Sequence, residues 1–232
     1  MKAKRVGIIC AMQIEAEHLL ENMTEKTCEE IGSVVFHRGN VGEREVILAV
    51  CGIGKVFSAL CTQTMILTYH PDCILNSGVA GSLSETLSIL DIVVSEGFVQ
   101  HDMDTSVIGD PKGLISGINQ VIFPADTALT GALEVCAKAL GLATAKGVIA
   151  TGDQFVADRK RKEEIVSLFH PLVCEMEAGA AAQVAYVNGT PFCAIRCVSD
   201  AYAGDAQMDY QQFAPLAARR SADLLLAFLK QQ

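Results

Sequence analysis

Phe192-Cys-Ala-Ile-Arg-Cys-Val198 is the longest of several short apolar runs that recur along the chain, and it leads directly into Ser199 and Asp200. A continuous run of this kind is typical of a strand that is covered on both faces of a sheet. Six shorter runs predict further strands: Val6 to Cys10, Val46 to Cys51, Cys73 to Asn76, Ile92 to Ser95, Gly147 to Ala150 and Leu172 to Cys174.

Helix-like stretches separate these runs. They cover about Gln13 to Asn22, Lys55 to Tyr69, Ala125 to Leu140, Lys160 to Phe169, Ala178 to Val187 and Tyr210 to Leu229. The alternation predicts an α/β fold, built as a single-domain three-layer sandwich with a mixed, largely parallel central sheet flanked by helices. Glu43, Arg44 and Glu45, which follow Gly39 to Gly42, indicate a hairpin turn between two antiparallel strands.

The length and the charge bound the class of protein. One α/β core can accommodate 232 residues, so residues 1–232 are expected to form one domain with one active site. A net charge of −9 and a pI near 5.0 argue against binding to nucleic acid or to an anionic membrane, since both require a clustered basic surface. The one basic cluster, Arg159 to Lys162, is followed at once by Glu163 and Glu164, and we interpret it as a solvated helix start.

The nine cysteines do not have the pattern of a disulfide framework or of a zinc site. Their number is odd, most lie inside apolar runs, and no two have a CxxC spacing. They are expected to be buried thiols in a reducing compartment, which indicates a cytoplasmic protein. The N-terminal apolar run lacks a cleavage pattern, and no segment approaches the roughly 20 apolar residues of a membrane span.

Open parallel sheets bind ligands where the carboxyl ends of their strands converge, which directs attention to the residues after each run. Gly52-Ile-Gly-Lys55 lacks the spacing of a Walker loop and the third glycine of a dinucleotide fingerprint, so no cofactor is predicted. The segment is either a plain turn or a turn whose backbone lies against a ligand. His101 to Phe123 predicts a long loop, and its first residues lack the spacing of metal ligands.

Acidic residues stand at three strand exits. Glu175 and Glu177 stand at the start of an Ala/Gly-rich helix. Their carboxylates could simply interact favourably with the helix dipole, or they could face one pocket. Asp200 suits a general acid because burial raises the pKa of a carboxyl group, and helix capping is the alternative. Arg196 needs a buried carboxylate partner, for which Glu15 is one candidate.

Taken together, these strings resemble the 5'-methylthioadenosine/S-adenosylhomocysteine nucleosidase family, within the purine nucleoside phosphorylase superfamily. The resemblance covers essentially the whole chain. It is carried by Gly7-Ile-Ile-Cys-Ala-Met12 with Glu15, Gly52-Ile-Gly-Lys-Val56, Asn76-Ser-Gly-Val-Ala-Gly81, Gly152-Asp153 with Phe155, Glu175-Met-Glu-Ala178, and Arg196 with Val198-Ser-Asp200. It implies a nucleoside phosphorylase-like fold and a hydrolase of adenine nucleosides that needs no cofactor and no metal.

The resemblance also implies a division of labour. Asp200 would protonate purine N7 and hold the 6-amino group, and Glu15 would activate the attacking water. Glu177 would stabilise an oxocarbenium-like transition state beside the ribose hydroxyls. Arg196 would hold Glu15 ionised and oriented. The substrates would be methylthioadenosine, S-adenosylhomocysteine and also 5'-deoxyadenosine, in methionine salvage.

Further residues enter the predicted substrate site through the same resemblance. Met176 would lie against the ribose, Phe155 against the purine face, the Val156 backbone at the purine edge and Tyr210 near the 5' side. Met12 and Ile53 would contact the alkylthio group. The predicted site also includes Val79, Glu175 and Ser199.

The chain departs from the family pattern at two places. Val79 stands where a serine usually lies near the water, and Ile108 and Asp110 replace aromatic residues of the loop after His101. In the family this loop reaches across a homodimer into the partner's 5' pocket. A homodimer with a less aromatic, more polar 5' pocket is therefore expected.

Two other functions fit the sequence less well. A phosphorylase of the same fold would need cationic groups for phosphate, and beyond Arg196 the strand exits offer only Lys55. A nucleoside-binding module without turnover would not require Glu15, Glu177 and Asp200 together. Hydrolysis is the favoured prediction.

Overall fold

The computed structural model describes residues 3–231, which form one ten-stranded mixed sheet and the helices packed against it. The strands are β1 (Arg5–Cys10), β2 (Thr24–Ile31), β3 (Val34–Val41), β4 (Arg44–Val50), β5 (Cys73–Ser82), β6 (Ile92–Gln100), β7 (Ile122–Pro124), β8 (Thr144–Thr151), β9 (Val173–Glu175) and β10 (Phe192–Asp200). Each of the seven predicted runs overlaps one of them. The predicted domain of residues 1–232 extends past the described residues at both ends, and its boundaries stay a prediction.

The pairing of the strands brings distant strand ends together. β1 is parallel to β4 and to β5, and β5 is parallel to β10. β10 also pairs with β6, and β6, β8 and β9 lead back to β5, so these five strands close into a ring. In this ring Thr151 is opposite Glu175, and Gly81 is opposite both Cys174 and Asp200. The last residues of β5, β8, β9 and β10 therefore meet.

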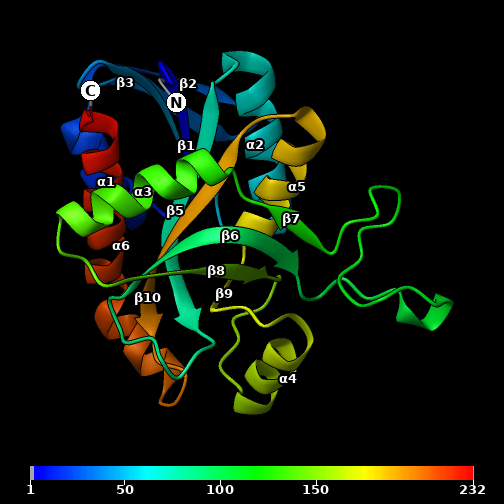
Figure 1. Cartoon of the computed structure of the whole chain (residues 1–232). Coiled ribbons are helices and arrows are strands. Elements are labelled where there is room, and N and C mark those ends of the chain that lie inside the picture. The colour runs from blue at the N-terminus through cyan, green and yellow to red at the C-terminus, as the bar shows by residue number, and fades with distance from the viewer. Residues whose placement is uncertain (1–2, 232) are drawn as a thin grey trace.

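Helices cover both faces of the sheet (Figure 1). One face carries α1 (Gln13–Asn22), α3 (Thr127–Ala139) and α6 (Ala206–Lys230), and the other carries α2 (Lys55–Tyr69) and α5 (Ala178–Asn188). A separate apolar cluster lies under α4 (Arg159–Phe169). Two cores on opposite faces of one sheet make the predicted three-layer sandwich, which is confirmed together with the antiparallel β3–β4 hairpin.

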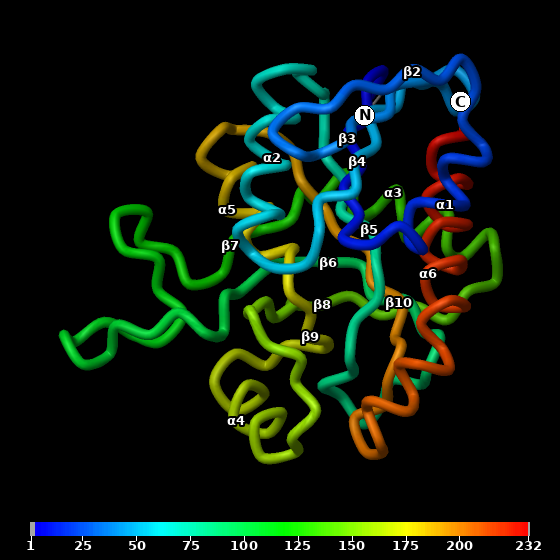
Figure 2. The backbone as a smooth tube through the Cα atoms, turned by 180° about the vertical axis from the view of Figure 1, so that it is seen from behind, coloured from blue at the N-terminus to red at the C-terminus, as the bar shows by residue number. Residues whose placement is uncertain are grey.

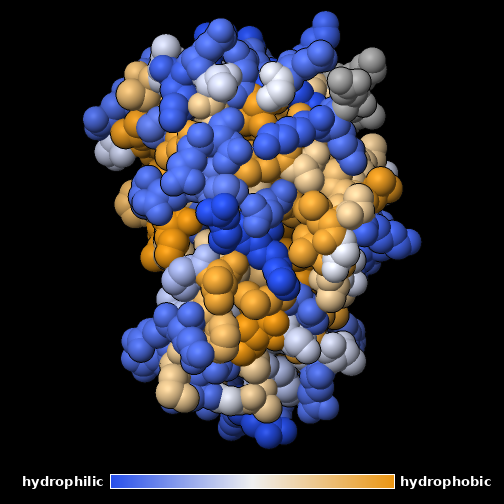
Figure 3. Space-filling model, turned by 90° about the vertical axis from the view of Figure 1, so that its left-hand side faces the viewer, coloured by the Kyte–Doolittle hydropathy of each residue, from blue (hydrophilic) through white to orange (hydrophobic). Residues whose placement is uncertain are grey.

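Both helical faces expose apolar side chains. The face with α1, α3 and α6 is mixed, with apolar patches between polar side chains (Figure 3), and its exposed apolar side chains include Val135, Met208 and Leu216. On α2 and α5 the exposed apolar side chains include Val56, Phe57, Leu60, Tyr186 and Val187. Among residues 3–231, no helix combines the length and the apolar character that crossing a membrane requires.

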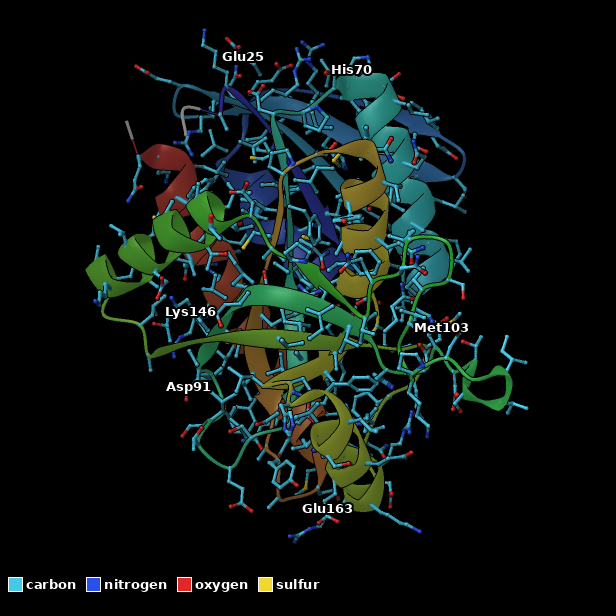
Figure 4. All side chains as sticks on the ribbon, turned by 45° about the vertical axis from the view of Figure 1, so that its right-hand side comes forward. Glu25, His70, Asp91, Met103, Lys146 and Glu163 are labelled. Carbon is cyan, nitrogen blue, oxygen red and sulfur yellow. The ribbon has the colours of Figure 1, made fainter. Side chains whose placement is uncertain are left out.

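Between β6 and β7 the chain leaves the body of the molecule as a long projecting loop, drawn in green in Figure 2. Figure 4 places Met103 where this loop departs. The loop contains one turn of 3-10 helix, η1 (Ser106–Ile108), before β7 rejoins the sheet. The long loop predicted from His101 is thus confirmed, although its predicted last residues belong to β7.

Candidate active site

A cavity of about 420 Å³ lies where the ends of β1, β5, β9 and β10 meet the loops after β4 and β8. This volume is within the range of small-molecule sites. The cavity is lined by Ala11, Met12, Glu15, Ile53, Val79, Ala80, Gly81, Gln154, Phe155, Val156, Cys174, Glu175, Met176, Glu177, Ser199, Asp200 and Tyr210. Of the residues predicted for catalysis or substrate binding within one chain, only Arg196 is not in contact with this cavity.

Glu15 is fixed by three backbone amides. Its Oε2 accepts hydrogen bonds from the N–H groups of Ala11 at 2.9 Å and Met12 at 3.0 Å, and its Oε1 accepts one from Val79 at 3.1 Å. The residue takes part in the capping of the first turn of α1 and also lines the cavity. Burial raises the pKa of Glu15, although the Arg196 charge and the three amides oppose that rise.

Glu175 and Glu177 serve different purposes at the start of α5. Glu175 Oε2 accepts from the N–H groups of Glu177 at 3.0 Å and Ala178 at 2.8 Å, so it caps the helix. Glu177 Oε1 instead accepts from the N–H of Gly54 at 2.8 Å. Gly54 has a φ of 102°, a conformation that favours glycine, and its turn presents its backbone to the site. Burial and the adjacent Glu175 charge raise the pKa of Glu177.

Arg196 differs from the sequence expectation. Its guanidinium is buried and donates to Glu175 Oε2 at 2.5 Å, and also to the side chain and backbone oxygens of Asn76. Arg196 was predicted to hold Glu15 ionised and oriented, and the orienting part of that prediction is wrong, because backbone amides hold Glu15 instead. Arg196 influences Glu15 only through its charge, which lowers the pKa of that carboxyl group.

Asp200 lies at the end of β10, after a bulge that interrupts the pairing with β5. Bulges redirect side chains next to active sites. Ser199 Oγ donates to Asp200 Oδ1 at 2.8 Å, and within residues 3–231 no backbone N–H donates to this carboxyl group. Asp205, rather than Asp200, caps α6, so the capping alternative is wrong. Burial raises the pKa of Asp200, against the influence of Ser199 and Lys162.

Apolar and aromatic side chains close the rest of the cavity. The rings of Phe155 and Tyr210 meet edge to face, with centroids 5.6 Å apart, and the Tyr210 hydroxyl donates to Met12 Sδ at 3.3 Å. The predicted site did not include the remaining lining residues: Ala11, Ala80, Gly81, Gln154 and Cys174. Ala11, Ala80 and Gly81 lie in the motif segments that carry the family resemblance, and Gln154 and Cys174 adjoin predicted residues in the chain.

Besides Arg196, two predicted residues lie outside this cavity. Ile108 and Asp110 are in the projecting loop, where Ile108 is exposed and Asp110 Oδ2 accepts from Thr105 Oγ1 at 2.8 Å. Their contribution to a partner's pocket stays a prediction. Lys55, the other cation near the strand exits, donates to Asp102 Oδ1 at 2.7 Å. Within the described part of the chain, no three His, Cys, Asp or Glu side chains are grouped as a metal site would require.

Comparison with known proteins agrees with this fold. The model of the phosphorylase superfamily matches residues 5–230, which defines the class of the chain. A 5'-methylthioadenosine/S-adenosylhomocysteine nucleosidase of Actinobacillus succinogenes is 37% identical, over 97% of this chain and 98% of the relative. The chain therefore belongs to the 5'-methylthioadenosine/S-adenosylhomocysteine nucleosidase family.

Solved structures show the same similarity. The nucleosidase of Neisseria meningitidis in complex with methylthio-immucillin-A is 33% identical with a TM-score of 0.94, and the match covers 98% of this chain and 99% of that one. A futalosine hydrolase of Helicobacter pylori is 35% identical with a TM-score of 0.95, over 99% of both chains. Relatives of equal structural similarity thus carry names for different substrates.

Proposed function

We propose that this protein hydrolyses the N-glycosidic bond of 5'-methylthioadenosine and S-adenosylhomocysteine, which releases adenine and the 5'-substituted ribose. The observation that carries the proposal is the convergence of Glu15, Glu177 and Asp200 on one cavity of suitable volume. These carboxylates come from α1, the start of α5 and the end of β10, so only the fold brings them together.

The chemistry requires a proton for the leaving purine and a nucleophile for the sugar. Asp200 gives its proton to N7 as the bond between N9 and C1' breaks, so adenine leaves as a neutral molecule. Glu15 takes a proton from water, whose oxygen bonds to C1'. General acid and base steps of this kind each contribute about 10²–10⁴-fold.

The cationic sugar formed on the way is stabilised by the surplus of negative charge around it. Glu15, Glu175 and Glu177 are all buried, and within residues 3–231 Arg196 is the only buried cation that pairs with one of them. A preorganised anionic environment of this kind stabilises an oxocarbenium-like transition state without reorganisation. Glu177 is assigned to the ribose hydroxyls, and Met176 to the apolar side of the sugar.

The cavity also supports the assignment of the two ends of the substrate. Met12 and Ile53 supply apolar surface for an alkylthio group, which carries no charge. Phe155 offers an aromatic face for the purine. Val79, at the serine position of the family pattern, contributes its backbone N–H to Glu15 and no hydroxyl to the water.

Phosphate is disfavoured as the nucleophile because the nearby cations are engaged. Lys55 is paired with Asp102, and Arg196 is buried against Glu175 outside the cavity lining. Adenine release from methylthioadenosine should therefore be unchanged when phosphate is added, with free 5-methylthioribose as the product. Strict dependence on phosphate, with a ribose 1-phosphate product, would overturn the hydrolase proposal. A protein that binds the nucleoside and releases no adenine would support the non-catalytic module instead.

The same panel can define the preference at the 5' position. Methylthioadenosine, S-adenosylhomocysteine, 5'-deoxyadenosine and futalosine would be compared by kcat/KM for release of the free base. The similarity to a futalosine hydrolase is the reason for including the last compound. We expect the first two compounds to be the best substrates.

The assembly and the cellular setting are also proposals. The exposed apolar side chains of α2 and α5 support a homodimer, in which the projecting loop would bring Ile108 and Asp110 to the partner's site. Eight of the nine cysteines are buried as free thiols, which supports a cytoplasmic enzyme of methionine salvage. Sedimentation analysis of wild type and Leu60→Lys tests the dimer: a monomeric wild type would contradict it.

A further inference from the structure

Lys162 is the one member of the basic cluster at the start of α4 that the protein buries. Only 2% of its surface is exposed, whereas Arg159 and Lys160 are exposed and Arg161 is partly exposed. The interpretation of the cluster as a solvated helix start was therefore wrong for Lys162. Figure 4 shows Glu163, the next residue, at the outer edge of the same helix. A buried ammonium group is costly unless it is paired and hydrogen-bonded.

The Lys162 ammonium points into the segment that connects β10 to α6. Its Nζ donates to the carbonyl oxygens of Ala201 at 2.9 Å and Tyr202 at 3.5 Å, and it lies 3.9 Å from Asp200 Oδ2. Asp209, from the first turn of α6, accepts from the N–H of Ala201 at 3.2 Å. The segment directly after Asp200 is thus fastened by α4 on one side and by α6 on the other.

The other charged and titratable groups around Asp200 cannot replace this cation. Lys162 lowers the pKa of Asp200, whereas the carboxylate of Asp209 raises it. Cys174 and Tyr210 also adjoin the carboxyl group, and both are neutral acids whose own pKa values are raised by burial. Lys162 is consequently the only cation that acts on Asp200 among the described residues.

We propose that Lys162 is a positioning residue for the general acid: it fixes the segment that carries Asp200 and compensates the carboxylate that remains after the proton is given away. The inference rests on the proposed hydrolase function. Lys162 itself does not line the cavity and has no contact with a substrate in it. Its separation of 3.9 Å leaves both Asp200 oxygens without a direct hydrogen bond from the ammonium group.

This arrangement explains how one carboxyl group can both hold and release a proton. Burial alone would keep Asp200 protonated and make it a weak acid, because its anion would be isolated in an apolar site. A cation about 4 Å away restores part of the stability of the anion, which improves proton transfer to the purine. A direct salt bridge would go further and keep Asp200 ionised, with no proton to give.

Lys162→Met tests the inference, with Lys160→Met as the matched control on the exposed side of α4. The pKa of Asp200 would be followed in the free protein by the ¹³C NMR shift of its carboxyl carbon. In Lys162→Met this pKa should rise by about one pH unit or more, since an opposite charge at this range shifts a carboxyl pKa by about that amount. Lys160→Met should leave it unchanged.

Kinetics supply the second readout. In Lys162→Met, kcat for adenine release should fall about tenfold or more while KM changes less than about twofold, since substrate binding is retained. The basic limb of the profile of kcat/KM against pH should move to higher pH together with the Asp200 pKa. Lys162→Gln keeps a polar donor without the charge, so it should show the same rise in the Asp200 pKa. This variant replaces Lys162→Met in the test if the methionine variant does not fold.

The outcomes separate the inference from the function on which it rests. If folded Lys162→Met or Lys162→Gln leaves the Asp200 pKa unchanged, the inference is overturned, even when activity falls. A loss of activity with an unmoved pH profile would likewise reduce Lys162 to a structural residue. If the wild type releases no adenine, the hydrolase proposal fails, and the NMR titration still decides whether Lys162 acts on Asp200.

Discussion

The two ends of the cavity, the proposed ribose end with Glu15, Glu175 and Glu177 and the proposed purine end with Asp200, hold their carboxylates in different ways. At the ribose end Glu15 accepts hydrogen bonds from three backbone N–H groups. Glu175 accepts hydrogen bonds from two backbone N–H groups and from the Arg196 guanidinium, and Glu177 accepts one from a backbone N–H group. At the purine end, Asp200 accepts one hydroxyl, from Ser199, and no backbone N–H within residues 3–231. Backbone donors stabilise a carboxylate in its charged form, since they cannot accept a proton in return.

This difference indicates which acid works as a donor and which works as an acceptor. Burial raises the pKa of both Glu15 and Asp200, so the direction of the pKa shift does not distinguish them. The number of fixed N–H donors does. On this criterion we expect Glu15 to remain an anion that accepts a proton from water. We expect Asp200 to remain protonated until it donates its proton to the purine.

The largest effect is expected at the purine end. Asp200→Asn should reduce kcat for adenine release by about 10⁴-fold, at the upper limit for loss of a general acid, because asparagine has no proton of suitable acidity. Single-turnover measurement of adenine release checks this. Asp205→Asn is the matched control, since asparagine caps a helix as well as aspartate does. Turnover within tenfold of wild type would mean that Asp200 is not the acid.

The corresponding change at the ribose end should be smaller and should have a different pH signature. Glu15→Gln removes the base and should lower kcat by about 10²–10³-fold, with binding of a nonhydrolysable methylthioadenosine analogue retained. In wild type the rate should fall as the pH drops through the pKa of Glu15, which burial places above the ordinary range for glutamate.

That acid limb should be absent from Glu15→Gln, because no base at this position remains to be protonated. Rates measured between about pH 4 and 8 for both proteins make the comparison. An acid limb of the same midpoint in the variant would assign it to another group. Loss of analogue binding without slow chemistry would also contradict the assignment of Glu15 as the base.

The third test concerns the free energy of unfolding, to which the buried ion pair of Arg196 and Glu175 contributes at the ribose end. Arg196→Met leaves the Glu175 carboxylate buried without its partner and should lower the free energy of unfolding by about 3–5 kcal/mol. Urea denaturation measures it. Adding Glu175→Gln should recover part of the loss, since the uncompensated charge is then removed. A loss below about 1 kcal/mol would show that the pair is less important than its burial indicates.

Much of this site was predictable because strand exits are visible in the sequence. The helices α1 and α2 begin and end at the predicted residues, and the acids at the ends of β9 and β10 were found by their position after apolar runs. The edge strand β2, Thr24–Ile31, was missed because its residues are polar and almost all exposed, so they lack strand periodicity.

The partners of the buried cations could not be predicted from the sequence, because they depend on which strands pair. Arg196 meets Glu175 only because β9 pairs with β5, which also pairs with β10. The burial of Lys162 did have a local signal: with Ile165 and Phe169 it follows the i, i+3, i+7 spacing of one helix face. The charge of its neighbours in the chain concealed that pattern.

The smallest predicted effect is the dependence of stability on pH at the purine end. Because the pKa of Asp200 is higher in the folded protein than in the unfolded chain, the folded state keeps its proton to higher pH. Below about pH 4 both states are protonated and the group costs no stability. As the pH rises from there through the folded pKa, the unfolded state gains from releasing its proton first, so wild type loses stability. Asparagine does not titrate, so Asp200→Asn escapes this loss.

The free energy of unfolding of Asp200→Asn minus that of wild type should therefore increase with pH, by about 1.4 kcal/mol for each unit by which folding raises the Asp200 pKa. Denaturation curves recorded from about pH 4 to 8 measure the difference, with the exposed Glu163→Gln as the surface control. A difference that decreases with pH would mean that the folded state favours the Asp200 anion. Asp200 would then be ionised near neutral pH and would have no proton to give.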